Sequence, residues 1–163
     1  MNIWNRDEQP VRFYRRGWYF QLSPLLPAED FAQFLETVDS SLSSGTTLKD
    51  SRTTTAAIRD LPPVGPVFLK RTNRKGFRFI LRYLFRRARS FRAAAATNAL
   101  IRAGIETPAV LAVGEHRTGL LLHAGYIINE ALEDARSCHG LLARTDSPAE
   151  LLTPLTGKAT ALL

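Results

Sequence analysis

The chain has 163 residues, of which 45% are hydrophobic and 23% are charged, and its formal net charge is +7. This length fits one domain, or one lobe and a piece of another, and the apolar fraction is sufficient for a buried core. The positive charge favours polyanionic partners, such as nucleic acid, anionic lipid or a phosphorylated glycan. Cys138 is the single cysteine, which excludes a disulfide within the chain and suits a reducing cytosol.

The sequence shows no signal for membrane insertion, export or metal binding. No stretch reaches the roughly 20 apolar residues that a transmembrane helix needs, and the first residues lack the apolar core of a signal peptide. His116 and His123 stand apart from any Cys/His cluster, so no metal site is expected. We therefore expect a cytoplasmic protein, or one bound peripherally to the inner membrane.

The first half of the chain predicts one helix and three strands. Residues 1–24 mix aromatic and basic side chains without a clear period, and no element is predicted there. Residues 27–38 predict a short helix, because their apolar residues recur at helical spacing. These residues are Phe31, Phe34, Leu35 and Val38. Three strands should follow as an antiparallel meander, because β-favouring runs alternate with turn residues. The strands are Thr46–Lys49, Thr54–Leu61 and Pro66–Arg71, and the turns are Asp50–Thr53 and Pro62–Pro66.

The second half predicts a long helix followed by two further strands. The helix should run from Phe77 to Ala103, with a break near Ser90 and with Gly104 as its C-terminal cap. An apolar face of its second part comprises Ala93, Ala96, Leu100 and Ile101. The two strands are Ala109–Glu115 and Leu120–Asn129, and Ser147–Glu150 has the pattern of a further helix start.

Lys70 is the first candidate for function. It stands near the end of an apolar strand, where its stem can pack while its ammonium is presented to phosphate groups. The alternative is an ordinary solvated strand end. The preceding turn offers Ser51, Arg52 and Thr53, whose hydroxyls, guanidinium and backbone amides can contact phosphate oxygens. It contains no glycine, and its alternative interpretation is an ordinary exposed hairpin.

The order of these motifs resembles the lipopolysaccharide kinase (Kdo/WaaP) family, over roughly residues 45–135. The motifs are Ser51-Arg52-Thr53, Val67-Phe68-Leu69-Lys70, Gly104-Ile105-x-Thr107-Pro108, Ala112-Val113-Gly114-Glu115 and Tyr126-Ile127-Ile128-Asn129-Glu130-Ala131-Leu132. The resemblance implies a bacterial cytoplasmic kinase with a protein-kinase-like fold, which uses ATP and Mg²⁺ to phosphorylate an inner-core sugar, Kdo or heptose. It implies that Lys70 is the catalytic lysine on the nucleotide phosphates. It also implies that Ser51, Arg52 and Thr53 lie near them, that Ile128 lines the adenine pocket, and that Glu130 to Leu132 form the hinge.

The chain departs from the family pattern in two ways. The family has a glutamate on the helix after the lysine strand, which pairs with the lysine, and the corresponding position here is Ala93. The family's catalytic loop and metal-binding Asp lie well downstream of the hinge, and Asp134 and Asp146 are too close to the hinge to match them. The sequence therefore predicts no metal ligand in this chain. We expect a truncated or degenerate member that is inactive alone.

A run of basic residues supports a second hypothesis, in which the protein is a binding module and not an enzyme. Half of the 22 Lys and Arg residues lie between Lys70 and Arg102, and no Asp or Glu occurs between Asp60 and Glu106. Arg74, Arg78, Arg82 and Arg86 recur every four residues and should form one ridge on the predicted helix. Such a ridge is typical of a non-catalytic module that binds an anionic membrane or lipid A phosphates, or less favourably nucleic acid. The alternative is a merely solvated basic face.

Together these patterns predict an α+β fold. We expect a protein-kinase-like small lobe, with a mostly antiparallel sheet of about five strands and one long helix. The predicted divisions are an N-terminal extension at 1–44, the lobe at 45–133 and the start of a helical large lobe at 134–163. The nucleotide and a lipopolysaccharide core or lipid A precursor are the expected partners.

Overall fold

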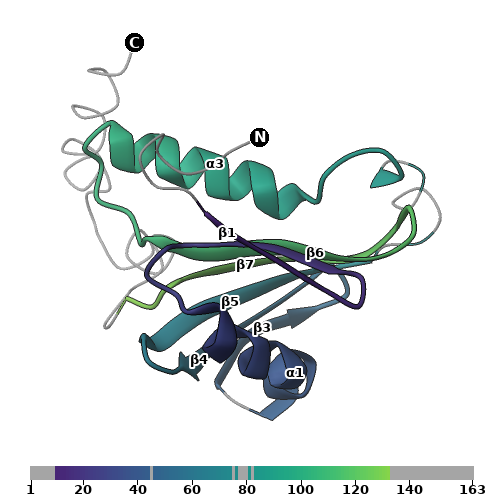
Figure 1. Cartoon of the computed structure of the whole chain (residues 1–163), viewed down its shortest axis with the longest axis horizontal. Coiled ribbons are helices and arrows are strands. Elements are labelled where there is room, and N and C mark those ends of the chain that lie inside the picture. Colours follow the sequence, from purple (N-terminus) through teal and green to yellow (C-terminus); the bar gives the residue numbers. More distant parts are fainter. Residues whose placement is uncertain (1–9, 45, 75, 77–80, 82, 133–163) are drawn as a thin grey trace, which may run out of the picture.

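The protein is an α+β structure built on one antiparallel sheet (Figure 1). The computed structural model describes residues 10–44, 46–74, 76, 81 and 83–132. The sheet has seven strands in the order β1-β2-β6-β7-β5-β4-β3. The strands are β1 Val11–Arg15, β2 Trp18–Leu22, β3 Thr46–Ser51, β4 Thr54–Leu61, β5 Gly65–Asn73, β6 Val110–Thr118 and β7 Leu121–Glu130. The helix α1 (Ala28–Ser44) packs on β4 at one face, and α3 (Arg89–Arg102) packs on β6 and β7 at the other (Figure 1).

The expectation of about five strands was wrong, because β1 and β2 add a hairpin to the sheet. β2 pairs with β6, and Arg16 and Gly17 turn the chain between β1 and β2 with φ angles of 45° and 84°. Positive φ at both positions is typical of the two-residue hairpin turn. The hairpin was missed because β2 is covered on both faces. Phe20 is buried in the core on the α1 side, whereas Tyr19 stacks on Phe91 of α3, so apolar and polar residues do not alternate.

The core between the sheet and α1 confirms the first predicted helix. Its four expected apolar residues are all buried, and they pack with residues of the strands. The helix is longer than predicted and continues to Ser44. The predicted strands of the meander are confirmed as β3, β4 and β5, and the last two strands as β6 and β7.

The long helix predicted over residues 77–103 is interrupted, as expected, but at residues 84–88 and not at Ser90, and the described residues Leu81 and Tyr83 before the break are helical. Residues 84–88 are not helical, and α3 begins at Arg89. The predicted apolar face is exposed, including Leu100 and Ile101, and the buried residues of α3 are Ser90, Phe91, Ala94 and Asn98. All four predicted residues lie within α3, and the four successive alanines at 93–96 put apolar residues on every side of the helix, so spacing does not identify the buried face. The predicted cap is confirmed, since Gly104 has a φ of 75° and the Ile105 N–H donates to Leu100 O at 3.0 Å.

The register between β5 and β7 decides which residues can form a site. Leu69 lies opposite Ile128, and Lys70 lies opposite Ile127. Successive side chains of a strand point to opposite faces. Leu69 and Ile128 are in the core under α1, and Ile127 is in the smaller cluster under α3. Lys70 therefore faces the side of the sheet that carries α3.

Candidate functional site

A cavity of about 260 Å³ lies where the β3–β4 turn, β5 and the start of α3 meet. Its lining residues are Thr53, Thr54, Lys70, Thr72, Arg89, Ser90, Ala93 and Ile127. We call it the Lys70 pocket. Three sequence-predicted positions meet there, namely Lys70, Thr53 of the turn and Ala93, where the resemblance requires a glutamate.

The Lys70 pocket is cationic and rich in hydroxyl groups. Lys70 and Arg89 supply two positive charges, and no Asp or Glu is among the lining residues that the structure describes. Neither cation forms an ion pair with another residue in the described ranges. Thr53, Thr54, Thr72 and Ser90 supply the hydroxyls, of which Ser90 Oγ donates to Gly114 O at 3.1 Å. Lysine, arginine and hydroxyl groups are the usual contacts of phosphate oxygens, so the lining suits a phosphorylated ligand.

Only part of the predicted turn reaches this pocket. Ser51 holds the turn together, because its Oγ donates to Thr54 O at 2.9 Å and accepts from the Thr54 N–H at 3.2 Å. Asn73 ties the turn to the end of β5, and the Asn73 N–H donates to Thr53 O at 3.0 Å. Arg52 is exposed and is not a lining residue. The turn is therefore fixed over the end of β5, and Thr53 is its residue in the pocket.

The structure does not bring Ile128, Glu130 or Leu132 into the Lys70 pocket. Ile128 is only 1% exposed and lies in the core on the opposite face of the sheet, so its neighbour Ile127 takes the lining position. The reason is the strand period of two, which a family motif does not specify. Glu130 and Leu132 are exposed at and beyond the end of β7, and the Glu130 N–H donates to Ala109 O.

Sequence reasoning missed a buried charged cluster beside α3, centred on Glu115. The Glu115 side chain is 5% exposed, and its Oε2 accepts the Ala88 N–H at 2.8 Å. Arg117 Nε lies 3.1 Å from Oε1, and Arg87 Nη1 lies 3.7 Å from it. Arg117 also donates to the backbone carbonyls of Tyr83 and Leu120. This cluster joins β6 to residues 83–88 and so fixes where α3 begins. Glu115 ends one of the motifs quoted for the family resemblance, but the motif gives it no role, and a Glu two residues before an Arg does not by itself indicate burial.

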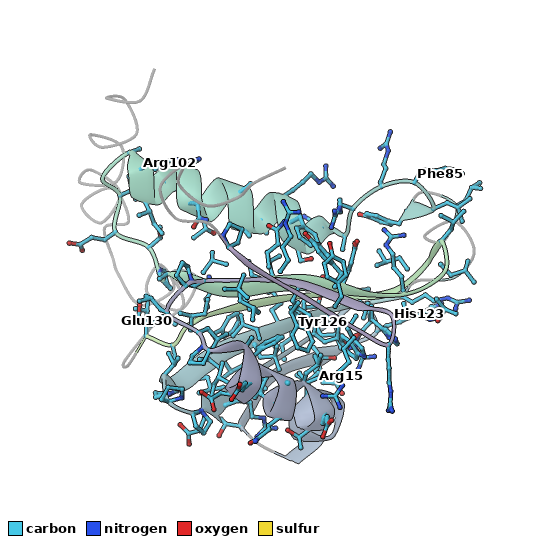
Figure 2. The ribbon with its side chains drawn as sticks, viewed as in Figure 1. Arg15, Phe85, Arg102, His123, Tyr126 and Glu130 are labelled. Carbon is cyan, nitrogen blue, oxygen red and sulfur yellow. The ribbon has the colours of Figure 1, made fainter. Side chains whose placement is uncertain are left out.

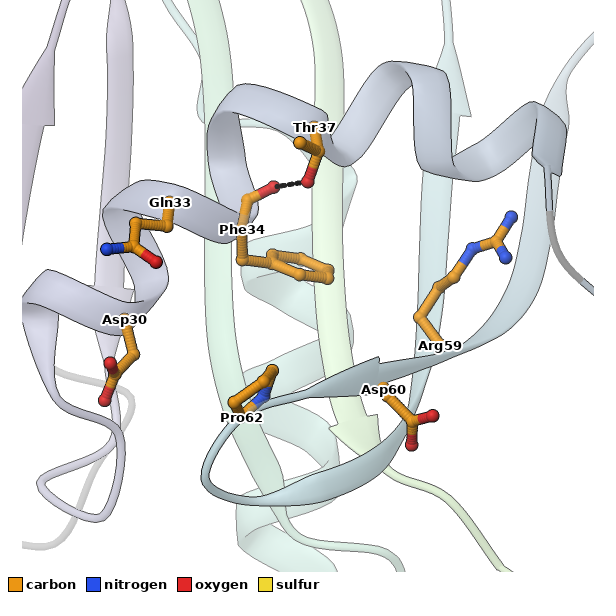
Figure 3. Close-up of a pocket in the computed structure, with 7 residues that line it drawn as sticks. All are labelled: Asp30, Gln33, Phe34, Thr37, Arg59, Asp60 and Pro62. Atoms are coloured by element: carbon orange, nitrogen blue, oxygen red, sulfur yellow. Dashed lines mark hydrogen bonds between the residues drawn. The ribbon is translucent and has the colours of Figure 1, made fainter.

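A second cavity, of about 290 Å³, lies on the α1 face (Figure 3). Asp30 and Gln33 of α1 and Arg59 and Asp60 of β4 are among its lining residues. Thr37 Oγ1 donates to Phe34 O at 3.0 Å along its rim (Figure 3). It contains none of the predicted site residues, and its two carboxylates do not favour a phosphorylated ligand.

The described residues do not form a metal site. They contain no group of three or more His, Cys, Asp or Glu side chains that could hold an ion. Because Mg²⁺ prefers oxygen ligands, especially carboxylates, the lining of the Lys70 pocket does not fit a magnesium ion by itself. Among the same described residues, no helix combines the length and apolarity required to cross a membrane.

The predicted arginine ridge does not form as one helical face. Arg86 lies in the non-helical segment before α3, and Arg74 directly follows β5. Arg78 and Arg82 lie outside the described residues, as do Cys138, Asp134, Asp146 and the helix start at Ser147.

Comparisons with known proteins give one match. No curated protein and no solved structure matches the chain significantly. The protein-family comparison matches residues 48–163 to the lipopolysaccharide kinase (Kdo/WaaP) family. The match covers well over half of the chain and includes the strand, helix and turn that line the Lys70 pocket. The chain therefore belongs to the lipopolysaccharide kinase (Kdo/WaaP) family.

Proposed function

We propose that the described lobe binds the phosphate groups of ATP in the Lys70 pocket. In this proposal the lobe serves a kinase that transfers the γ-phosphoryl group to a hydroxyl of an inner-core sugar, Kdo or heptose. The observation that carries the proposal is the meeting of Lys70, Thr53 and α3 around one cationic cavity. Family membership supports it, because kinases of this kind generally use ATP and Mg²⁺.

The proposal gives each lining group a role. Lys70 is held by a strand in the middle of the sheet and presents a cation to phosphate oxygens from a fixed frame. The β3–β4 turn covers the phosphates with Thr53 and Thr54. Ile127, in place of Ile128, provides the apolar floor. Phosphoryl transfer also needs metal clamps and a residue that positions the nucleophile. The described lining of the Lys70 pocket supplies neither, so the proposal assigns nucleotide binding, and not the chemical step, to these residues.

The test is calorimetry with ATP and Mg²⁺ on the parent protein and two lysine variants. Lys70→Ala should weaken ATP binding by about tenfold or more, because it removes a charge-assisted contact of roughly 1.5–3 kcal/mol. Lys49→Ala is the matched control, since Lys49 is exposed on β3 and does not line the pocket. Equal affinities in all three proteins would exclude the Lys70 pocket as the nucleotide site.

One exposed region favours a second role, at an anionic membrane surface. Phe85 is 83% exposed and Leu120 is 56% exposed, and they flank a surface hollow together with Arg86 and Arg87. Figure 2 shows Phe85 at the end of the molecule opposite Arg102. Apolar side chains beside arginines suit the boundary between acyl chains and anionic headgroups. We propose that this end rests on the inner membrane of a bacterial cell, near the lipopolysaccharide precursor.

Vesicle sedimentation tests this second role. The double variant Phe85→Ser/Arg86→Gln should bind vesicles containing anionic lipid several-fold less than the parent, because it loses both apolar insertion and a charge worth about 1 kcal/mol. Arg102→Gln removes the same type of charge at the opposite end and should bind like the parent. If both variants bind as the parent does, this end is only a solvated surface. Equal or tighter binding of the parent to duplex DNA would favour nucleic acid instead.

A further inference from the structure

The start of α3 adds a second cation to the Lys70 pocket. We propose that Arg89 binds phosphate together with Lys70, and that this pair lets the pocket hold a polyphosphate chain without a divalent metal ion. The inference rests on the proposed function, in that it assigns the phosphates of the ligand to this pocket. It concerns Arg89, which belongs to none of the motifs quoted for the family resemblance.

The position of Arg89 is fixed by its neighbours. It is the first residue of α3, directly after Ala88, whose N–H is held by the buried carboxylate of Glu115 at 2.8 Å. On its other side, the hydroxyl of Ser90 is bonded to Gly114 O. Both contacts tie the first turn of α3 to β6. Arg89 therefore reaches the pocket from an anchored backbone.

The positive charge of the pocket favours a ligand that carries more than one negative charge. Two cations that line the same cavity repel each other, and no described carboxylate lies among the lining residues to offset this. A polyphosphate chain supplies several negative charges and enough oxygens for both a lysine and the two-pronged guanidinium of an arginine. A divalent cation in the same place would add to the repulsion.

The alanine at position 93 leaves Arg89 able to bind phosphate. Ala93 lies one helical turn after Arg89 and lines the same cavity. A glutamate at 93 would face both Lys70 and Arg89, since residues four apart on a helix are neighbours. Its absence leaves both cations available to a ligand.

The experiment compares inorganic tripolyphosphate and ATP, each titrated by calorimetry in EDTA and again with Mg²⁺. The variants are Arg89→Gln, Lys70→Gln and Arg89→Lys, with Arg92→Gln as the matched control. Arg92 is exposed on α3 and does not line the pocket. In EDTA, Arg89→Gln and Lys70→Gln should each weaken tripolyphosphate binding about tenfold, and Arg89→Lys should weaken it less. Arg92→Gln should match the parent, and thermal melts will show that all variants are folded.

A fifth variant, Ala93→Glu, tests the charge argument directly. The sequence alone suggests that this glutamate would orient Lys70 and strengthen nucleotide binding. With Arg89 in the same cavity, we expect instead that it weakens tripolyphosphate binding in EDTA by about tenfold, and that added Mg²⁺ restores part of the loss.

The outcomes separate this inference from the proposed function. If Lys70→Gln weakens ATP binding but Arg89→Gln does not, the inference is wrong and the proposed function stands. If the parent binds neither ligand in EDTA but binds ATP with Mg²⁺, the metal-free part is overturned. If ATP never binds while tripolyphosphate binding needs both cations, the nucleotide proposal fails and the anion site remains. If neither ligand binds under any condition, both fail.

Discussion

Glu115 shows how one buried carboxylate sets the geometry of the candidate site. It accepts a backbone N–H at the start of α3 and pairs with Arg117, which in turn donates to three backbone carbonyls. A buried charge is tolerated only when such partners replace its hydration. The cluster therefore links the stability of the fold to the position of the first turn of α3, which carries Arg89 and Ser90 into the Lys70 pocket.

We predict that Glu115→Ala strongly destabilises the protein. The change leaves Arg117, whose side chain is 20% exposed, without its carboxylate. Breaking a buried ion pair by removing one partner costs about 3–5 kcal/mol, and the partial exposure of Arg117 places the expected loss at about 3 kcal/mol. Urea denaturation measures this loss. Glu106→Ala, at an exposed position outside the cluster, should change stability by less than about 0.5 kcal/mol. Similar losses in the two variants would contradict the role of the cluster.

At the scale of single residues, the sequence singled out Lys70 as a candidate site residue but did not identify the residues that line the pocket around it. A lysine on an apolar strand is visible as a local pattern, and its place in the order of motifs singled it out. Ile128 was chosen over Ile127 because adjacent apolar residues in a strand covered on both faces are indistinguishable by pattern. Arg89 was one of many arginines, and only the fold shows that it lines the cavity.

At the scale of elements, two glycines allow the sheet to be approached closely from both sides. A Cβ atom at Gly125 of β7 would lie 2.8 Å from Ala88 Cβ, just before α3. A Cβ atom at Gly114 of β6 would lie 2.3 Å from the ring of Phe20, on the neighbouring strand β2. Neither glycine needs a special φ angle, so the requirement is one of space. The family motif that contains Gly114 therefore has a packing reason in this chain.

We predict that Gly125→Ala moves the start of α3 away from β7. The added methyl group overlaps Ala88 Cβ and lies 3.1 Å from Ser90 Oγ, and neither belongs to a long side chain that could rotate away. Overpacking of this kind typically costs about 1–3 kcal/mol. The change should lower the melting temperature and also weaken tripolyphosphate binding. Gly119→Ala serves as a comparison, since its Cβ would meet open space although its φ of 57° adds strain. It should lower stability without weakening tripolyphosphate binding, and loss of binding in both variants would argue against this displacement.

The element scale also shows where periodicity failed. The first helix was predicted because it is continuous and carries its apolar residues on one face. The break in the second was expected near Ser90 but lies at residues 84–88, because these residues are held by Arg117 and Glu115, which are more than 25 residues away in the chain. No local pattern reports such a tertiary contact.

At the scale of the whole molecule, the sheet includes strands that precede the residues matched to the family. The family match begins at residue 48, within β3, whereas β1, β2 and α1 precede it. These elements contribute Phe20, Leu22 and Phe31 to the main core, and all three are at most 1% exposed. The family region and the N-terminal region thus share one core.

We predict that the protein does not fold cooperatively when residues 1–44 are removed. The edge of β6 would lose its partner β2, and the α1 face of the sheet would be left open to solvent. Circular dichroism melts and binding of a hydrophobic dye measure this outcome. Phe20→Ala is the milder version and should cost about 3–5 kcal/mol while the fold remains. A sharp melt of the shortened protein, with no dye bound, would mean that the family region folds alone.

Side chains of β5 and β7 alternate between the core and the pocket, and this alternation restricts where residues can be inserted or deleted. Leu69 and Ile128 serve the core, whereas Lys70 and Ile127 serve the pocket, and each pair lies side by side. Inserting or deleting one residue in β5 would send the lysine into the core or the leucine into the pocket, and the same change in β7 would reverse the faces of the residues that pack against them. Related sequences should therefore vary in length at the turns around Arg52, Pro62 and Gly119. Between Val67 and Asn73, and between Leu122 and Asn129, only substitutions should be tolerated.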